Sequence, residues 1–364
     1  MSDSTFGFIG LGLIGGSIAR GLRRANKDIT IMAYMRTRSK LEQAKADGTI
    51  DMILDGIDET LSACDVIFLC TPVEYNAVYL EKVRPFLKPG ALITDIGSTK
   101  TDIHQAVERL DYEDVFVGGH PMAGSEKNGY ESSTDHLLEN AYYIITPTKK
   151  STPEQIGRIR QVALAIGALP IVLDYHEHDF SVAAISHLPH LVASSLVNLV
   201  HDNDSKDEIM KRLAAGGFKD ITRIASSSPV MWEQICMTNT ENILVLLKRY
   251  ITSLESICDT LENHNGDAIY KMFEESGKYR STFPNRGQGP IERDYSFCVD
   301  VLDEPGSISV LSAILAAKGI SVKNIGINHS REEGEGALLI SFYKEDKKNE
   351  AAELLRSHNY VLTK

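Results

Sequence analysis

The sequence predicts an α/β domain with a parallel sheet, then an all-helical domain and a small α+β domain. Between residues 1 and 174, short runs of β-branched and aromatic residues alternate with helical stretches, the pattern of parallel strands joined by crossover helices. From 175 to 283 the strand signal disappears and apolar residues repeat at helical spacing. After a Gly-, Pro- and Arg-rich linker at 284–294, short strands and helices return over 295–364.

The first domain is expected to present its functional residues at one edge of the sheet. Its predicted strands lie at residues 5–9, 29–34, 65–70, 91–96, 115–118, 142–146 and 169–173. In open sheets of parallel strands, ligands bind outside the carboxyl ends of the strands. The residues that follow these strands are therefore the first candidates for a site.

A glycine-rich turn, G-x-G-x-x-G, follows the first strand and precedes a helix predicted over 14–24. Gly10 would permit the tight turn, Gly12 the approach of a pyrophosphate, and Gly15 the packing of helix on strand. This context predicts a Rossmann-type dinucleotide site, with a merely structural turn as the alternative. The cofactor-binding residues expected here are Gly10, Gly12, Leu13, Ile14 and Gly15.

The second strand lacks the acid that usually binds the adenosine ribose of NAD. That Asp or Glu stands about 20 residues after the turn, where this chain has Met35, followed by Arg36, Thr37 and Arg38. Two guanidinium groups beside hydroxyls suit a 2′-phosphate, which favours NADP. In the alternative the arginines stack on adenine or face solvent, so NAD and NADP both stay open.

Three polar clusters are expected to converge at the strand ends: Thr71 with Pro72, residues 95–100, and residues 120–126. His120 follows a predicted strand at once, so its side chain should project into the crevice. An imidazole there can accept a proton from a hydroxyl whose carbon loses hydride. A purely structural histidine is the alternative.

The helical domain carries two apolar stripes. One runs through 188–199, and the other repeats with heptad-like spacing at Ile243, Leu247, Tyr250, Leu254, Ile257 and Leu261. The second stripe suits long helix–helix packing. It fits the core of a bundle within one chain and a homodimer interface equally well.

The same domain offers candidates for binding an anion. Ser186 and His190 are four residues apart, with Pro189 bending or starting a helix. Lys219, Arg223 and Ser227 would share one helical face, which can grip a carboxylate or be simply solvated beside Asp220.

Two further features have a structural interpretation by default. Trp232, the only tryptophan, is expected to pack in a core. The run His-Glu-His at 176–178 lacks the spacing of a helical ligand pair, so no metal site is expected.

Composition narrows the partners and the compartment. A net charge of −12 makes nucleic acids and anionic membranes poor partners, and no apolar run is expected to reach the length of a membrane span. Five widely spaced cysteines without C-x-x-C fit a reducing compartment. With a first strand at Thr5 there is no room for a signal peptide, so a cytoplasmic protein is predicted.

Taken in order, these motifs resemble one family. The runs GLGLIGGS, DIGSTK, GGHPMAGSEKNG, SHLPH and FKDITRIASSSPVMW are similar to those of the prephenate dehydrogenases over roughly residues 5–280. The resemblance implies a Rossmann domain, an all-helical dimerisation domain, and oxidative decarboxylation of prephenate with a nicotinamide dinucleotide. The tail, with VLDEPGSISVLSAILAAKGISVKNIGI, resembles an ACT domain, the βαββαβ module that binds amino acids.

The resemblance also implies roles for individual residues. His120 matches the catalytic histidine that accepts a hydrogen bond from the C4 hydroxyl, and Ser98 a serine that touches that hydroxyl and the nicotinamide. Arg223 matches the arginine that binds a substrate carboxylate. Trp232 matches a tryptophan presented by the partner subunit, and Glu126 an acidic gate. The helpers implied in substrate binding are Ser186, His190, Lys219 and Ser227.

For the tail, the resemblance implies feedback by L-tyrosine. The effector residues expected are Asp303, Pro305, Gly306 and Ser307, at a helix N-terminus, and Asn324. A structural dimerisation module is the alternative.

Other functions compete with this assignment. A β-hydroxyacid or 6-phosphogluconate dehydrogenase would place a lysine where this chain has SHLPH. Arogenate dehydrogenase differs only in the amino group of its substrate. A non-catalytic nucleotide sensor would need the glycine turn but not His120, Ser98 and Arg223 together. Family members that use NAD often carry an acid at the position of Met35, so we expect measurable use of both cofactors.

Overall fold

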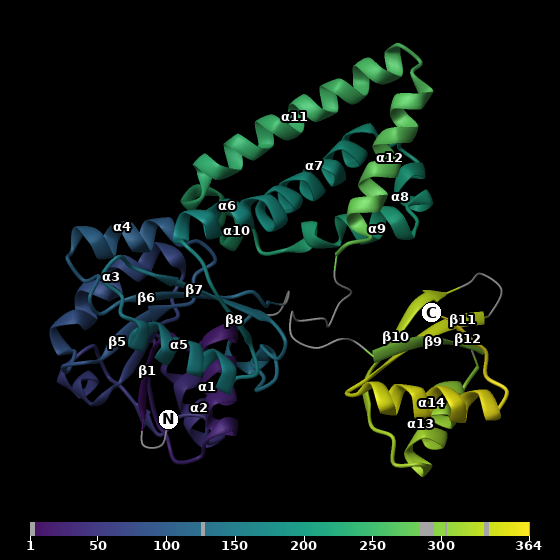
Figure 1. Ribbon diagram of the computed structural model, residues 1–364. Helices are drawn as coiled ribbons and strands as arrows, with labels where there is room; N and C mark the ends of the chain where they lie inside the picture. Colours follow the sequence, from purple (N-terminus) through teal and green to yellow (C-terminus); the bar gives the residue numbers. More distant parts are fainter. Residues whose placement is uncertain (1–3, 125–127, 284–294, 303, 331–334, 364) are drawn as a thin grey trace. The chain divides into compact units, whose positions relative to one another are not determined.

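The computed structural model describes residues 4–124, 128–283, 295–302, 304–330 and 335–363. The chain forms two compact units, Met1–Phe283 and Pro284–Lys364, and each is described separately. The first unit contains both the α/β part and the helical part (Figure 1).

A five-stranded parallel sheet forms the centre of the α/β part, in the order β3-β2-β1-β4-β5. Residues of alternating parity bury on its two faces: Phe6, Phe8 and Phe68 in one core, Ile9 and Ile67 in the other. Both faces are covered, which explains why the strands are apolar throughout. The strands are β1 Thr5–Ile9, β2 Thr30–Tyr34, β3 Met52–Ile53, β4 Val66–Leu69 and β5 Leu92–Asp95. The connecting helices are α1 Leu13–Ala25, α2 Arg38–Ala46, α3 Val73–Val83 and α4 Thr101–Arg109.

The predicted parallel sheet is wrong beyond β5. Strands β6 (Val117–Pro121), β7 (Tyr142–Pro147) and β8 (Leu169–Val172) form a separate sheet in which β6 and β7 are antiparallel. The physical reason is the connection between β6 and β7, where the described residues contain only a short 3-10 turn and no crossover helix. Helix α5 (Pro153–Ala165) joins β7 to β8, and that pair is parallel.

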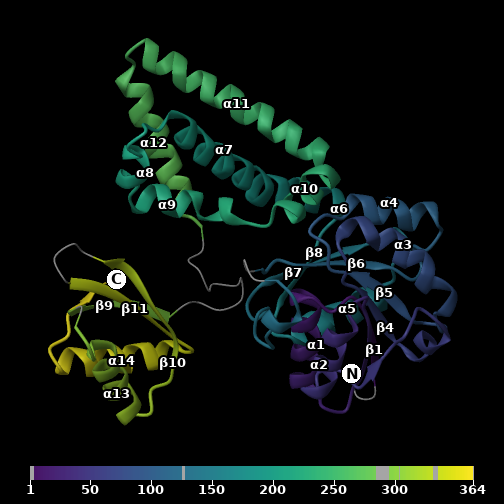
Figure 2. The same cartoon turned by 180° about the vertical axis from the view of Figure 1, so that it is seen from behind.

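The helical part begins with α6 (Tyr175–Val182), a π-helical turn (Ala183–His187) and α7 (Leu188–Asn203), which has Pro189 in its first turn. It continues with α8 Ile209–Leu213, α9 Gly216–Thr222, α10 Pro229–Thr238, α11 Thr240–Glu262 and α12 Gly266–Arg280. Helix α11 runs beside α7 in both views (Figure 2).

The expectation that no apolar run reaches membrane length is not confirmed. The continuous helical segment Tyr175–Asn203 is long and apolar enough to cross a membrane by length and composition alone. Only 22% of its most apolar window is buried. The segment packs against α11 and lines the cavity described below, so we interpret it as a bundle helix with an uncovered apolar face.

The second unit has the predicted order βαββαβ. Its elements are β9 Tyr295–Leu302, α13 Ser307–Ala317, β10 Val322–Ser330, β11 Glu335–Phe342, α14 Glu345–Ser357 and β12 Leu362–Thr363. The sheet order is β10-β11-β9-β12, all antiparallel, and both helices lie on one face (Figure 1). Phe297, Val299, Leu311, Leu315 and Leu355 build its own core.

A fully buried ion pair joins β5 to β6. The ammonium of Lys100 contacts the carboxylate of Asp95, and both side chains are 0% exposed. The same ammonium donates to the carbonyl oxygen of Gly119 (2.7 Å), while Asp95 accepts from the backbone N–H of Gly97 (2.9 Å) and of Gly119 (3.3 Å). Burial lowers the pKa of Lys100, and the charge of Asp95 offsets part of that effect.

Replacing Lys100 by Met should leave the buried carboxylate of Asp95 without its cationic partner. This change should lower the free energy of unfolding by about 3–5 kcal/mol. Urea unfolding would measure this loss. The double variant Lys100→Met/Asp95→Asn removes the stranded charge and should recover part of it. An unchanged unfolding midpoint for Lys100→Met would contradict the importance of the pair.

Candidate active site

The glycine turn has the geometry that a bound pyrophosphate needs. Gly10 has φ +93°, and a Cβ there would lie 2.7 Å from the carbonyl oxygen of Cys70. A Cβ on Gly15 would lie 3.0 Å from the Sγ of Cys70, so Gly15 allows the close packing of α1 on the sheet. A Cβ on Gly12 would meet nothing within 4 Å, which leaves its face open to a ligand. The three positions fit the separate roles expected from the sequence.

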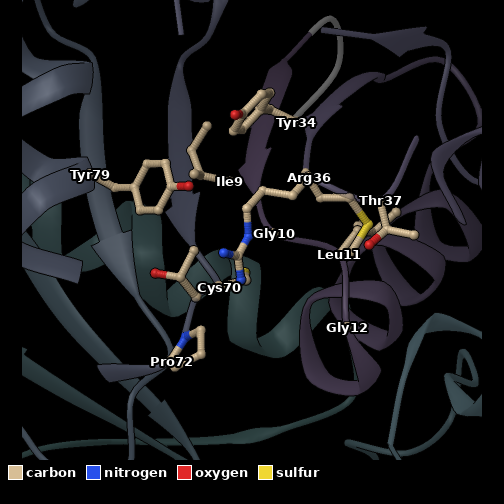
Figure 3. Close-up of a pocket in the computed structure, with 12 residues that line it drawn as sticks. Ile9, Gly10, Leu11, Gly12, Tyr34, Arg36, Thr37, Cys70, Pro72 and Tyr79 are labelled. Atoms are coloured by element: carbon tan, nitrogen blue, oxygen red, sulfur yellow. The ribbon is translucent and has the colours of Figure 1, made fainter. Parts of the chain in front are cut away.

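A cavity of about 240 Å³ opens beside this turn. Of the residues predicted to bind cofactor, it is lined by Gly10, Gly12, Arg36, Thr37, Thr71 and Pro72. Figure 3 shows the side chain of Arg36 reaching across it toward the glycine turn, with the Tyr79 ring opposite. A cation and an aromatic ring suit the adenosine end of a dinucleotide.

Arg38 is placed differently from the prediction. It begins α2 outside the residues that line this cavity, and its guanidinium pairs with Asp55 and Glu42. The hydrogen bond and charge of Asp55 raise the pKa of Arg38. Arg36 is therefore the guanidinium at the cavity itself.

A larger cavity of about 640 Å³ adjoins the first and shares Gly12, Cys70, Thr71 and Pro72 with it. It brings together the strand ends of the α/β part and the helices of the bundle. The predicted residues that line it are Gly12, Leu13, Ile14, Gly15, Thr71, Pro72, Ser98, His120, Ser186, His190, Arg223, Ser227 and Trp232. The α/β part and the helical part of the first unit thus meet at one cavity.

His120 lies within β6, as its fourth residue, rather than after a strand. Its Nδ1 is 2.7 Å from the Nε2 of His178, and its ring lines the large cavity. Burial lowers the pKa of His120 well below its ordinary value, and the positive charge of Lys100 lowers it further. The ring is therefore held neutral and can accept a proton.

His190 and Trp232 line the large cavity from the helical part. Nδ1 of His190, in the first turn of α7, donates to the carbonyl oxygen of Ser186 in the π-helical turn (2.8 Å). The Trp232 ring stacks on His190 with 3.7 Å between centroids. Burial lowers the pKa of His190. A π-helical turn at a cavity wall is a frequent mark of function.

Trp232 lines the large cavity of its own chain. Helix α10 packs against α3 through Gln234 and Glu74 (2.9 Å) and against Thr99 through Thr238 (2.9 Å). Trp232 is not in a closed core, since it lines the cavity. Its presentation to a partner subunit stays a prediction.

The predicted helical face through Lys219, Arg223 and Ser227 is wrong. Helix α9 ends at Thr222, residues Arg223–Ser226 form a 3-10 turn, and Ser227 and Ser228 are extended before α10 begins at Pro229. Pro229 disfavours helix in Ser228, the residue before it. Arg223 and Ser227 still line the cavity, but exposed Lys219 does not.

Sequence reasoning missed His178 and Asp179, which lie directly behind His120. The only sequence signal for these two residues is the run His-Glu-His at 176–178, whose spacing does not fit a metal site. It does not indicate a contact with another histidine. It also missed the apolar lining from Met122, Met231 and Ile235. Glu126 and Asp303 lie outside the described residues.

Comparisons with known proteins agree on one family. A family model described as "Prephenate dehydrogenase, nucleotide-binding domain" matches residues 18–172, and one described as "Prephenate dehydrogenase, dimerization domain" matches residues 174–275. A prephenate dehydrogenase of Bacillus subtilis is 37% identical over 96% of this chain and 94% of its own length.

Two solved structures are similar as well. The prephenate dehydrogenase of Aquifex aeolicus, in complex with hydroxyphenyl propionate and NAD+, is 30% identical with a TM-score of 0.72 over 77% of this chain and 98% of its own. The arogenate dehydrogenase of Synechocystis is 30% identical with a TM-score of 0.70 over 77% of this chain and 100% of its own.

Proposed function

The chain belongs to the prephenate dehydrogenase family, and we propose that it converts prephenate to 4-hydroxyphenylpyruvate by NAD(P)-dependent oxidative decarboxylation. The observation that carries this proposal is the large cavity, which is lined by Ser98 and His120 from the α/β part and by His190 and Arg223 from the helical part. The glycine turn adjoins the same cavity.

The lining residues suit this chemistry. Prephenate is a dianionic cyclohexadienol, and loss of hydride from C4 with loss of the ring carboxylate as carbon dioxide gives an aromatic ring. A bound nicotinamide supplies the hydride acceptor. Neutral His120 takes the hydroxyl proton, Ser98 touches the same hydroxyl, and Arg223 binds a carboxylate. Aromatisation drives the reaction, so the residues mainly align the reactants.

Arogenate is the second candidate substrate. The observation that favours it is the 30% identity with the Synechocystis arogenate dehydrogenase, equal to that with the Aquifex enzyme. The rates with prephenate and arogenate, measured at equal concentrations, decide between the two.

For the cofactor, we propose that both NAD and NADP are used. Met35 and Arg36 line the adenosine-side cavity, where an acid would bind the ribose hydroxyls of NAD. The guanidinium of Arg36 supports binding of a 2′-phosphate. The NAD+ in the Aquifex structure supports NAD for the family fold.

We propose a cytoplasmic homodimer whose interface is formed by the helical part. Of the apolar stripe on α11, only Ile243 is buried in a single chain, while Leu254 and Leu261 are 43% and 57% exposed. An uncovered stripe of this length favours an interface between copies over a bundle core. All five cysteines are free, which supports a reducing compartment.

We propose that the second unit is an ACT domain that binds L-tyrosine. Support comes from its βαββαβ order and from Gly306, whose φ of +100° places it at the N-cap of α13, beside Pro305 and Ser307. Among the described residues no side chain caps this helix end. The N–H of Ser307 donates to the carbonyl oxygen of Glu304 (3.2 Å), and we propose that the N–H groups that follow it in the first turn bind a carboxylate. Asn324 lies on β10, paired with Ser341.

Replacing His120 by Asn should abolish turnover, because the amide cannot accept the hydroxyl proton; a loss of about 10²–10⁴-fold in kcat is expected. Absorbance of the reduced nicotinamide with prephenate measures the rate. Cofactor binding, followed by titration, should be retained. Unchanged turnover would end the assignment of His120 as the base.

Arg36→Ala should weaken NADP binding by at least about 10-fold, since it removes the cation facing the 2′-phosphate, and should change NAD binding little. Arg38→Ala is the matched comparison and should have a smaller effect, because that guanidinium is engaged by Asp55. KM values for both cofactors measure the effects. Equal losses for NAD and NADP would contradict recognition of the phosphate by Arg36.

Truncation after Phe283 should keep dehydrogenase activity and remove inhibition by tyrosine, because the two units have separate cores. Rates with and without tyrosine, for the full chain and the truncated one, test this. A truncated enzyme inhibited to the same degree would place tyrosine at the active site.

A further inference from the structure

Two buried residues, His178 and Asp179, form a chain of hydrogen bonds that ends on His120. Nε2 of His178 is 2.7 Å from Nδ1 of His120, and Nδ1 of His178 is 2.7 Å from Oδ1 of Asp179. The side chains of His178 and Asp179 are 1% and 0% exposed. Neither lines the large cavity, so each can act on the reaction only through His120.

The hydrogen bonds that Asp179 accepts keep its carboxylate ionised. The carboxylate accepts from the backbone N–H of Lys100 and of Thr101 (both 2.8 Å), from the Thr101 hydroxyl (2.6 Å) and from His178. Burial alone would raise the pKa of Asp179, but the hydrogen bonds from His178 and Thr101 outweigh it and lower that pKa. Asp179 is therefore ionised and can only accept.

The negative charge of Asp179 determines which ring nitrogen carries the proton in His178 and in His120. Since Asp179 only accepts, Nδ1 of His178 must carry a proton. Nε2 of His178 and Nδ1 of His120 are 2.7 Å apart, so one of them donates to the other; with a single proton on His178, at Nδ1, the donor is Nδ1 of His120. The remaining nitrogen of His120, Nε2, is left with its lone pair.

We propose that His178 and Asp179 are positioning residues that hold His120 as its Nδ1–H tautomer, with Nε2 as the base. This inference rests on the proposed function. In the reaction, the substrate O–H bond breaks, its proton forms a bond to Nε2 of His120, and the electron pair stays on the oxygen. His120 becomes an imidazolium whose Nδ1–H donates to His178 and, through it, faces the charge of Asp179.

The groups around His120 make this support necessary. The positive charge of Lys100, which follows β5, disfavours protonation of His120, and so does His187 in the π-helical turn when it is protonated. Asp95 neutralises Lys100. On the α6 side, Asp179 is the anion linked to His120 through a hydrogen-bonded ring.

Asp179 also anchors α6 to the start of α4, so its loss would disturb the fold. The test therefore uses His178. His178→Phe removes the acceptor, and His178→Gln keeps an amide oxygen that can accept from His120. His176→Phe is the matched control, at an exposed histidine two residues earlier in the same helix.

The first readout needs no turnover. The ¹⁵N chemical shifts of the His120 ring, assigned with His120→Asn, report which nitrogen carries the proton. The wild type, His176→Phe and His178→Gln should show the Nδ1–H form, and His178→Phe should show the Nε2–H form or a mixture.

The second readout is kinetic. His178→Phe should lower kcat by about 100-fold, the scale on which a positioned general base acts, with KM nearly unchanged. His178→Gln should restore most of the rate. The same His120 tautomer with and without His178, or an unchanged kcat in His178→Phe, would overturn the proposal. Wild-type protein inactive on prephenate and arogenate would instead overturn the proposed function, while the tautomer comparison would still stand.

Discussion

The site depends on one buried ion pair, between Lys100 and Asp95. Its ammonium holds the carbonyl of Gly119, the residue before His120, and its own backbone N–H donates to Asp179 on α6. One residue therefore ties β5, β6 and the helical part together at the point where the chemistry is proposed. Taking both charges out of water is unfavourable. The geometry suggests that the pair specifies the position of His120 more than it adds stability.

Features fixed by local chemistry could be predicted from the sequence. Gly10 must adopt a positive φ and Gly12 must leave room for phosphate, so the turn could be predicted from the short motif G-x-G-x-x-G. Strand ends of a parallel sheet converge by topology, which placed Thr71 and Ser98, after β4 and β5, at one cavity. His120 lines the same cavity although it lies within β6, outside the parallel sheet. The order of the second unit followed from period-two and helical patterns alone.

Features fixed by contacts between distant segments could not. The direction of β6 against β7 depends on how an irregular connection folds back. The helical face expected through Ser227 is interrupted by the 3-10 turn at Arg223–Ser226 and by extended residues before Pro229. His178 is 58 residues from His120, and no local pattern predicts their contact. The lining by Arg223 was nevertheless found, because one guanidinium was needed for an anionic ligand.

The imidazoles at the cavity explain why that guanidinium matters. Burial lowers the pKa of His120 and of His190, and it lowers the pKa of His187 to about 4. These rings are therefore neutral at physiological pH and give little attraction to a dianion. Neutrality is what a base needs, since a protonated His120 could not take up a hydroxyl proton. In the proposed reaction, two tasks that histidine could have combined are therefore separate: we propose that Arg223 supplies the permanent charge and that the buried imidazoles supply directional acceptors.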